Sequence, residues 1–260
     1  NSSNRKPSAD TSGSISFDDT GRVTRIDGTR IAENQARESG QPLVLPGFID
    51  LHVHGGGGRD IMQGADAGVR VSETHARHGT TSMLATTMTA PKEDLVMALT
   101  ALKTVCIDRS AQGARVLGVH LEGPYINDEK LGAQPDFARP VQVNELNALN
   151  LLAPIRLITM APEVPGNMEL IDSLREAGYR IQIGHTTGSY EDGVNALARG
   201  AGGFTHLFNA MTGMHHREPG MVGAALAHAK YTEIIPDLLH VHPGAIRVAL
   251  RAIPCLYCVT

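Results

Sequence analysis

Short apolar segments alternate with amphipathic helical segments about eight times between residue 43 and the end of this 260-residue chain. Strands that alternate with helices predict a parallel sheet covered by helices, and eight such units fit a closed (β/α)8 barrel of the TIM type. An open doubly wound sheet is the alternative, but no G-x-G-x-x-G follows the first predicted strand. The predicted strands are 43–54, 80–87, 115–122, 155–161, 180–185, 203–208, 232–240 and 255–260, and the clearest predicted helices are 92–108, 143–152, 167–177, 190–199 and 243–252.

Residues 1–42 differ from the rest and are predicted to form a separate segment, with the barrel running over 43–260. Residues 1–13 are polar and have no apolar period, which predicts a loosely attached end. Residues 14–27 are typical of a β-hairpin, because two alternating segments flank a D-D-T-G-R turn. A two-stranded hairpin is only marginally stable by itself, so we expect further strands to cover it.

Composition excludes several classes of function. A formal net charge of −4 argues against general binding to nucleic acid or to a membrane surface, so an anionic substrate needs a local basic pocket. The three cysteines do not indicate a disulfide framework. Cys255 and Cys258 share one predicted strand and point to opposite faces, which argues against a common metal or redox site. Because neither a signal peptide nor an apolar run of roughly 18 residues is visible, we expect a soluble cytoplasmic protein.

Histidines and one glutamate stand at the C-terminal ends of the predicted strands, where the active site of a barrel enzyme lies. Taken singly, each is more often a structural histidine or an ordinary loop acid. A set of them on successive strands is costly to bury unpaired, and a metal ion explains the set jointly. Imidazole nitrogens with a carboxylate suit Zn²⁺ or Fe²⁺ and leave a position for water. The set comprises His52, His54, His120, Glu122, His185, His206, His240 and His242.

Six segments form a recognisable series in the second part of the chain. They are P-G-F-I-D-L-H-V-H (46–54), H-L-E-G-P-Y (120–125), I-G-H-T (183–186), T-H-L-F-N-A-M (205–211), H-H-R-E-P-G (215–220) and D-L-L-H-V-H-P (237–243). The series resembles the N-acetylglucosamine-6-phosphate deacetylases, a family of metal-dependent amidohydrolases, from about residue 43 to residue 260. The H-x-H segment marks only the superfamily, whereas H-L-E-G-P followed by F-N-A-M and R-E-P-G is much more specific.

The resemblance implies a set of metal ligands. Glu122, His185 and His206 would be the principal ligands, and His52 and His54 would hold a second ion in the members that bind two. Glu122 would then lie between the ions. Many relatives in the superfamily bridge two ions with a carboxylated lysine, but no lysine stands at a predicted strand end here. The residues alone do not choose between one ion and two.

The resemblance also implies a set of substrate contacts and a homodimer. The guanidinium fork of Arg217 matches phosphate oxygens, although a structural ion pair between Arg217 and Glu218 stays open. Gln134 would contact the sugar, and the residues around the sugar phosphate would be Asn209, the backbone of Ala210, Arg217 and His240.

The implied reaction is hydrolysis of the acetamide of N-acetylglucosamine 6-phosphate to glucosamine 6-phosphate and acetate. A bound divalent ion lowers the pKa of its water toward about 7 and polarises the amide. In the family an aspartate at the end of strand eight carries a proton from the water to the amine, and it would follow Thr260. We therefore expect a chain that is truncated in strand eight, lacks the catalytic residue, and keeps only a remnant hairpin of a small β-sandwich. A natural truncated paralogue stays open.

Two residues depart from the family pattern. Leu238 stands where the family usually has glycine in a D-G-x-H pattern, and a leucine there is expected to crowd the neighbouring His240 or to shift the strand. Pro236 lies inside the predicted strand 232–240, where it would remove a ladder donor.

Three functions fit this sequence. The first is the deacetylase described above. The second is another amidohydrolase, such as an N-acetylgalactosamine-6-phosphate deacetylase or a D-aminoacylase-like enzyme, although the F-N-A-M and R-E-P-G segments favour a sugar phosphate. The third is a non-catalytic relic that binds a metal or a sugar phosphate, which the missing aspartate favours and the intact ligand set opposes.

Overall fold

The chain divides into two compact units, Asn1–Pro46 and Gly47–Thr260. The computed structural model describes residues 10–108, 110 and 112–260. The first unit contains an antiparallel hairpin of β1 (Asp10–Phe17) and β2 (Val23–Ile31), followed by helix α1 (Glu33–Glu38). The D-D-T-G-R segment forms the turn, because Asp18 Oδ1 accepts hydrogen bonds from the N–H groups of Thr20 and Arg22.

The hairpin is longer than the sequence predicts. Residues 10–13 were expected to belong to a loosely attached end, but they pair with β2 as far as Ile31. Backbone pairing requires no apolar side chains, so the polar composition of this segment concealed the strand. The expectation for residues 1–9 lies outside the described residues. That the hairpin belongs to a β-sandwich stays a prediction.

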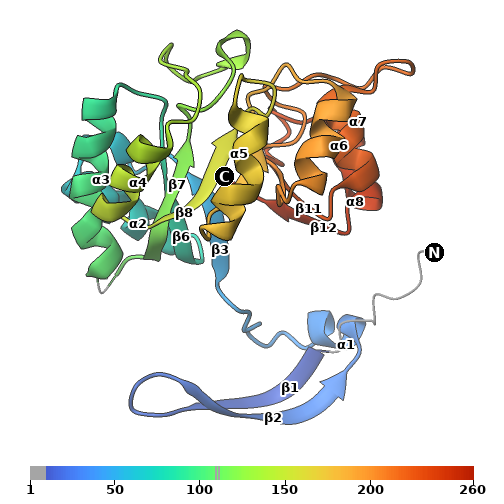
Figure 1. The fold of residues 1–260 in the computed structure, drawn as a ribbon. Coiled ribbons are helices and arrows are strands. Elements are labelled where there is room, and N and C mark those ends of the chain that lie inside the picture. The colour runs from blue at the N-terminus through green and yellow to red at the C-terminus, as the bar shows by residue number, and fades with distance from the viewer. Residues whose placement is uncertain (1–9, 109, 111) are drawn as a thin grey trace. The chain divides into compact units, whose positions relative to one another are not determined.

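Eight parallel strands form a nearly closed barrel in the second unit, which confirms the predicted fold class (Figure 1). Each strand pairs with the next barrel strand along the chain, from β3 to β12. Between these two end strands, Thr260 Oγ1 donates to Asp50 Oδ2 at 2.7 Å. The barrel strands are β3 (Phe48–Val53), β6 (Thr80–Thr87), β7 (Arg115–Glu122), β8 (Ile155–Met160), β9 (Arg180–Ile183), β10 (Gly203–Phe204), β11 (Tyr231–Ile234) and β12 (Cys255–Cys258), and a small hairpin of β4 (Gly55–Gly56) and β5 (Arg59–Asp60) follows the first of them.

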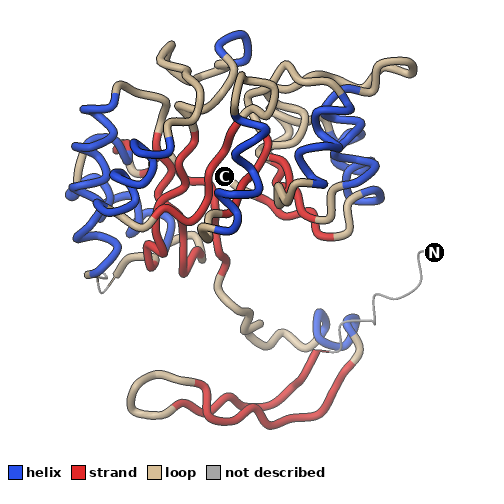
Figure 2. Tube along the Cα trace, viewed as in Figure 1, coloured by secondary structure: helices blue, strands red, loops and turns tan. Residues whose placement is uncertain are grey.

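Helices connect the strands and surround them (Figure 2). Helix α3 buries Leu95, Leu99 and Leu102 on one stripe, and each fully buried leucine stabilises the fold by roughly 1.5–3 kcal/mol. None of the helices in the described residues is long and apolar enough to cross a membrane. The helices of this unit are η1 (Ile61–Gln63), α2 (Ala65–Ala76), α3 (Lys92–Ile107), η2 (Asp128–Lys130), α4 (Val143–Leu152), α5 (Asn167–Glu176), α6 (Tyr190–Ala198), α7 (Gly220–His228) and α8 (Pro243–Ala252).

Two α-helices of this unit, α2 and α7, were not among the clearest predicted helices, and both bury small residues. Helix α2 buries Ala67, Gly68, Val71 and Ser72, so its apolar stripe is weak in the sequence. Helix α7 has the sequence G-M-V-G-A-A-L-A-H and is buried over most of its surface. A helix that is apolar all round has no amphipathic period by which it can be found.

Two barrel strands end earlier than predicted because the backbone turns at the residues that follow. Strand β9 ends at Ile183, and His185 has a φ of +49°. Strand β10 ends at Phe204, while His206 and Phe208 have φ values of +30° and +81°. A non-glycine residue with φ between +30° and +81° lies outside the extended region that a strand requires. The histidines therefore lie on the loops just beyond the strands.

The predicted first and seventh strands were also too long. Strand β3 begins at Phe48 instead of residue 43, because Pro42 and Pro46 have no N–H to donate to a ladder. Strand β11 ends at Ile234, so Pro236 lies beyond it and removes no ladder donor, contrary to the prediction. His240 accordingly lies on a loop and does not end a strand.

Candidate metal centre

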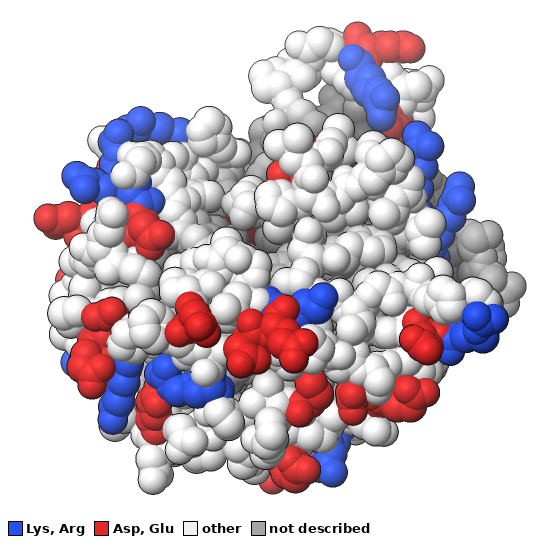
Figure 3. All heavy atoms as spheres, turned by 90° about the horizontal axis from the view of Figure 1, so that it is seen from above, with Lys and Arg blue, Asp and Glu red and all other residues white. Residues whose placement is uncertain are grey.

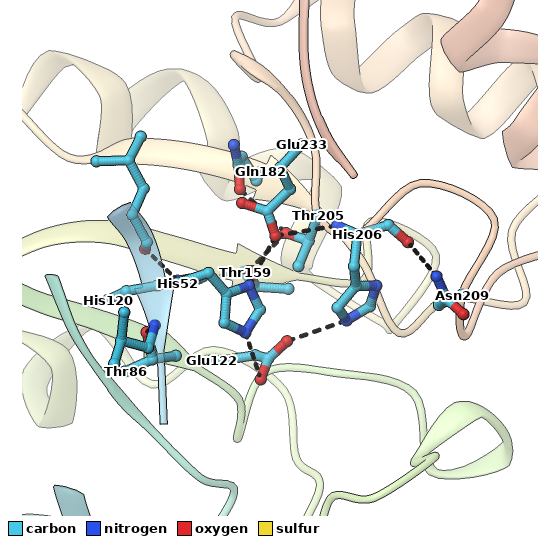
Figure 4. Close-up of polar contacts among 12 residues, drawn as sticks. His52, Thr86, His120, Glu122, Thr159, Gln182, Thr205, His206, Asn209 and Glu233 are labelled. Carbon is cyan, nitrogen blue, oxygen red and sulfur yellow. Dashed lines mark hydrogen bonds and ion pairs between the residues drawn. The ribbon is translucent and has the colours of Figure 1, made fainter. Parts of the chain in front are cut away.

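The C-terminal ends of the barrel strands and the loops just beyond them bring four of the predicted histidines around the carboxylate of Glu122, and Figure 4 shows two of them, His52 and His206. Glu122 ends β7 and is 1% exposed. Its Oε2 lies 3.4 Å from His52 Nε2 and 2.8 Å from His54 Nε2. Its Oε1 lies 3.2 Å from His185 Nε2 and 3.1 Å from His206 Nε2. Each carboxylate oxygen therefore faces one pair of histidines.

The spacing of these donor atoms fits a divalent metal ion. The two Nε2 atoms of each histidine pair, His52 with His54 and His185 with His206, lie 3.0 Å apart. Ligand atoms that share one tetrahedral ion stand roughly 3.3 Å apart when each metal–ligand distance is about 2.0 Å. Two nitrogen lone pairs at 3.0 Å repel each other unless a cation lies near both. The donor set is thus assembled as two adjoining groups that share Glu122.

The outer nitrogens of two of these rings determine which atom faces the centre. His185 Nδ1 lies 2.7 Å from the carbonyl oxygen of Lys130, and His52 Nδ1 lies 2.7 Å from Glu233 Oε1. Carbonyl and carboxylate oxygens only accept, so both Nδ1 atoms carry a hydrogen and both Nε2 atoms face the centre, where they can offer a lone pair to an ion when the ring is neutral. Among the described residues, His54 Nδ1 and His206 Nδ1 are buried without a hydrogen-bond partner.

The electrostatics of the centre call for positive charge. Burial raises the pKa of Glu122, but nearby His52 and the hydrogen bonds from His185 and His206 outweigh it, so the pKa lies well below its usual value. Burial by itself lowers the pKa of His52, but the charges of Glu122 and Glu233 raise it by more. The net pKa of His52 is therefore well above 6.5. Two buried carboxylates therefore need a cation between them, which a proton on His52 or a divalent ion can supply.

Three histidines of the predicted set lie outside the two donor groups: His120, His242 and, on the exposed loop, His240. His120 is fully buried, donates from Nδ1 to the carbonyl oxygen of Leu51 at 3.1 Å, and has Nε2 at 2.8 Å from Thr159 Oγ1. Burial first, and His52 second, lower the pKa of His120 to about 3, so it is a neutral structural residue. His242 is the N-cap of α8, where its Nδ1 accepts from the N–H of Gly244.

Glu233 and Asp50 were missed by the sequence reasoning. Glu233 lies on β11 and is fully buried. Asp50 precedes His52 by two residues on β3, and its Oδ1 accepts from the N–H of His52 at 3.1 Å. Each is an acid inside an otherwise apolar or strand-like segment, and that is the signal that could have identified them.

A cavity of about 1200 Å³ opens onto the metal centre and contains most of the predicted substrate contacts. Asn209, Ala210 and His240 line it. Gln134 also lines it, donating from Nε2 to Glu122 Oε2 at 2.6 Å and accepting from the N–H of Thr89 at 2.6 Å. These four residues therefore lie on the same cavity as the donor atoms.

Arg217 is the exception among the predicted substrate contacts. It lies on an exposed segment, does not line the cavity, and makes no ion pair with Glu218 in the described part of the chain. Among the described lining residues there is neither lysine nor arginine, so the expected basic pocket is represented there only by histidines. On the face seen in Figure 3, basic and acidic side chains are interspersed around the periphery.

The backbone around the cavity holds several residues in the left-handed region. Ala210 has a φ of +50°, and its carbonyl oxygen accepts from the N–H of Thr186 at 3.0 Å. Gly184 packs so closely that a Cβ there would lie 2.8 Å from both Thr159 Cγ2 and Thr205 Cβ.

Leu238 has a φ of +67°, is 61% exposed, and is not a lining residue. The expected crowding of His240 by Leu238 is therefore wrong, and the preference for glycine at this position arises from the backbone.

Known proteins resemble this chain over most of its length. The profile described as "Amidohydrolase family" matches residues 43–242. An N-acetylgalactosamine-6-phosphate deacetylase of Escherichia coli O157:H7 is 40% identical over 78% of this chain and 55% of its own length. An N-acetylglucosamine-6-phosphate deacetylase of Bacillus subtilis (strain 168) is 36% identical over 89% of this chain and 61% of its own.

Solved structures have a fold similar to that of this chain. An N-acetylglucosamine-6-phosphate deacetylase from Thermotoga maritima superposes with a TM-score of 0.82 at 26% identity, covering 95% of this chain and 65% of that one. The enzyme of the same description from Pasteurella multocida gives 0.76 at 33% identity, covering 83% and 57%. The chain thus spans a little over half the length of the relatives that it matches.

Proposed function

The chain belongs to the amidohydrolase family, and from that membership we propose that it is the metal-binding barrel of an N-acetylglucosamine-6-phosphate deacetylase. The reaction is hydrolysis of the acetamide to glucosamine 6-phosphate and acetate. The observation that carries the proposal is the carboxylate of Glu122, which faces one histidine pair with each oxygen beside a large cavity. Curated relatives at 36–40% identity that are named as hexosamine-phosphate deacetylases support the substrate class.

Members of this family depend on a metal, and the donor set fits a divalent ion. We assign one ion to Glu122, His185 and His206, and a second to His52, His54 and Glu122. Zn²⁺ and Fe²⁺ both suit imidazole with carboxylate. When bound, such an ion lowers the pKa of its water toward about 7 and polarises the amide carbonyl.

The remaining residues bind and orient the sugar phosphate. Gln134 both holds Glu122 and lines the cavity, so it lies where the sugar meets the donor set. Asp237 Oδ2 holds His240 Nδ1 at 2.7 Å, which leaves the other ring nitrogen free for the substrate. Asn209 and the Ala210 backbone complete the wall of the cavity. We assign Arg217, which lies outside the cavity, to a phosphate that extends beyond the mouth.

The epimer N-acetylgalactosamine 6-phosphate is a second candidate substrate. The 40% identical relative bears that substrate in its name, which favours it directly. The two sugars differ only in the orientation of one hydroxyl group, so their binding differs by the hydrogen bonds that this group makes. The expected homodimer and cytoplasmic location stay predictions, and light scattering of the purified chain tests the first.

The test is acetate release from each of the two sugar phosphates by the chain loaded with Zn²⁺ or Fe²⁺. Metal-dependent release establishes the deacetylase, and the ratio of kcat/KM values identifies the epimer. Glu122→Gln is the control, because it removes the carboxylate that faces both histidine pairs. Stoichiometric metal without release indicates an assembled but inactive site, and a chain that retains no metal contradicts the ligand assignment.

A further inference from the structure

Glu233 lies behind both halves of the metal centre, on the side away from the donor atoms. Its side chain is fully buried on β11. One oxygen, Oε1, accepts from His52 Nδ1 at 2.7 Å and from the N–H of His206 at 3.0 Å. Figure 4 shows His52 between Glu233 on one side and Glu122 on the other. Glu233 therefore touches one member of each donor group.

We infer that Glu233 is a positioning residue that couples the two ion positions, because a single oxygen orients the ring of His52 and fixes the backbone of His206. The inference rests on the proposed metal-binding function. Glu122 joins the two groups at their donor atoms, and Glu233 joins them from behind. Displacement of Glu233 Oε1 should accordingly disturb both groups together.

The ring of His52 depends on Glu233 for its orientation. Its Nδ1–H donates to Glu233 Oε1, which leaves the Nε2 lone pair directed at Glu122 and His54. An acceptor on the outer nitrogen sets both the tautomer and the rotation of a ligating imidazole. Without that acceptor the ring can rotate or exchange tautomers, and its Nε2 no longer points at the centre in every molecule.

His206 depends on Glu233 through its main chain. Its φ of +30° lies in the left-handed region, which is strained for a non-glycine residue. A hydrogen bond from a backbone N–H to a charged acceptor offsets this strain. His206 Nδ1 has no partner in the described residues, so the ring has no outer anchor of its own. The bond to the Glu233 side chain is therefore the contact that fixes the His206 N–H itself, while the N–H groups of Thr205 and Leu207 bond to main-chain carbonyl oxygens.

The surroundings of the second oxygen make it possible to separate position from charge. Glu233 Oε2 lies 3.5 Å from the hydroxyl of Tyr257, which also accepts from Gln182 Nε2. A glutamine at position 233 can keep Oε1 in place and turn its amide nitrogen toward Tyr257. An aspartate keeps the charge but withdraws the oxygen by one methylene. Glu233→Gln therefore preserves position, and Glu233→Asp preserves charge.

The experiment is calorimetric titration of the metal-free chain with Zn²⁺, repeated with Co²⁺ so that its visible absorption reports the ligand geometry. Glu233→Asp is expected to weaken both ions by roughly 10–100-fold, the usual range for loss of an outer partner of a ligand, and to change the Co²⁺ spectrum. Glu233→Gln is expected to retain most of the affinity and the wild-type spectrum. Glu145→Gln is the matched control, because Glu145 is a largely buried carboxylate that pairs with Arg139 away from the donor groups.

The outcomes separate this inference from the proposed function. A wild-type chain that binds no ion overturns both. If the wild-type chain binds two ions, and Glu233→Asp keeps its affinity for both or loses affinity for only one, the coupling is overturned and the proposed function stands. If Glu233→Gln loses both ions while Glu233→Asp keeps them, charge and not position is responsible, and the inference fails. Far-UV circular dichroism of each variant checks that it folds, and a variant that is folded without metal but binds both ions more weakly supports the inference.

Discussion

The metal centre and the loop that carries His240 differ in how their side chains are held. Glu122 and the His52 ring are buried and bonded to residues from other strands. The loop is exposed, and Asp237 accepts from the N–H groups of Leu239 and His240 and from the His240 ring, all within four residues. Contacts between distant residues hold the centre, and local contacts hold the loop. Substitutions in the two regions should therefore have separable effects on metal, substrate and stability.

The largest effect is expected from Glu122→Ala. Glu122 alone provides an oxygen to both histidine pairs, so its removal should abolish stoichiometric retention of either ion. The measurement is metal content by mass spectrometry after dialysis against a weak chelator. Retention of both ions would show that the histidines hold them without Glu122. The metal centre would then not depend on this contact between distant residues, and its contrast with the loop would be lost.

Metal removal should come next in size. An ion that binds only the folded chain stabilises it by about 2.7 kcal/mol at a free concentration of 100 times Kd. Addition of a strong chelator should therefore lower the midpoint of thermal unfolding. Hydrogen exchange should accelerate at 183–186 and at 205–211, and remain unchanged in the β1–β2 hairpin. An equal acceleration in the hairpin would contradict a local effect of the ion.

His240→Ala and Asn209→Ala test the cavity wall. Loss of a hydrogen bond to a charged ligand costs roughly 1.5–3 kcal/mol, so Kd for glucosamine 6-phosphate should rise about 10–100-fold. Metal content should remain that of the wild type, because neither residue belongs to a donor group. A variant that loses metal together with sugar binding would mean that loop and centre are one unit.

Leu238→Gly should have the smallest effect. The φ of +67° costs a leucine on the order of 1–2 kcal/mol, and the greater freedom of glycine in the unfolded chain cancels about 0.5–1 kcal/mol of the gain. We expect stabilisation below about 1 kcal/mol, measured by urea unfolding, with metal content unchanged. Leu239→Gly is the matched control, since Leu239 is 91% exposed and is not among the residues with positive φ, and it should destabilise instead.

The regular parts of the barrel could be predicted closely. The segments 80–87 and 115–122 coincide with β6 and β7, because their apolar runs are bounded by turn residues. The limits of β9, β10 and β11 were misjudged, because apolar residues continue beyond β10 and β11 and because the histidine after β9 was counted as part of the strand. Positive φ at His185 and His206 follows from the packing of neighbouring loops, which periodicity does not report.

The candidate donor residues were likewise predicted in part from the sequence and settled in part only by the structure. Placement at strand ends was enough to select His52, His54, Glu122, His185 and His206, because parallel strands direct their ends to one face of a barrel. It also selected His120 and His242, which the structure assigns to packing and to a helix cap. Alternation tells which face a side chain points to and says nothing about how deep it lies.

The sequence by itself determined the barrel, the family and the choice of the five candidate donor residues, because these follow from local patterns and short motifs. Only the tertiary structure decided which nitrogen each ring presents and that Glu233 contacts both groups. His52 and Glu233 are 181 residues apart in the chain, and no local pattern relates them. Their contact exists because the closing of the barrel brings β11 near β3, so it depends on the packing of the whole unit.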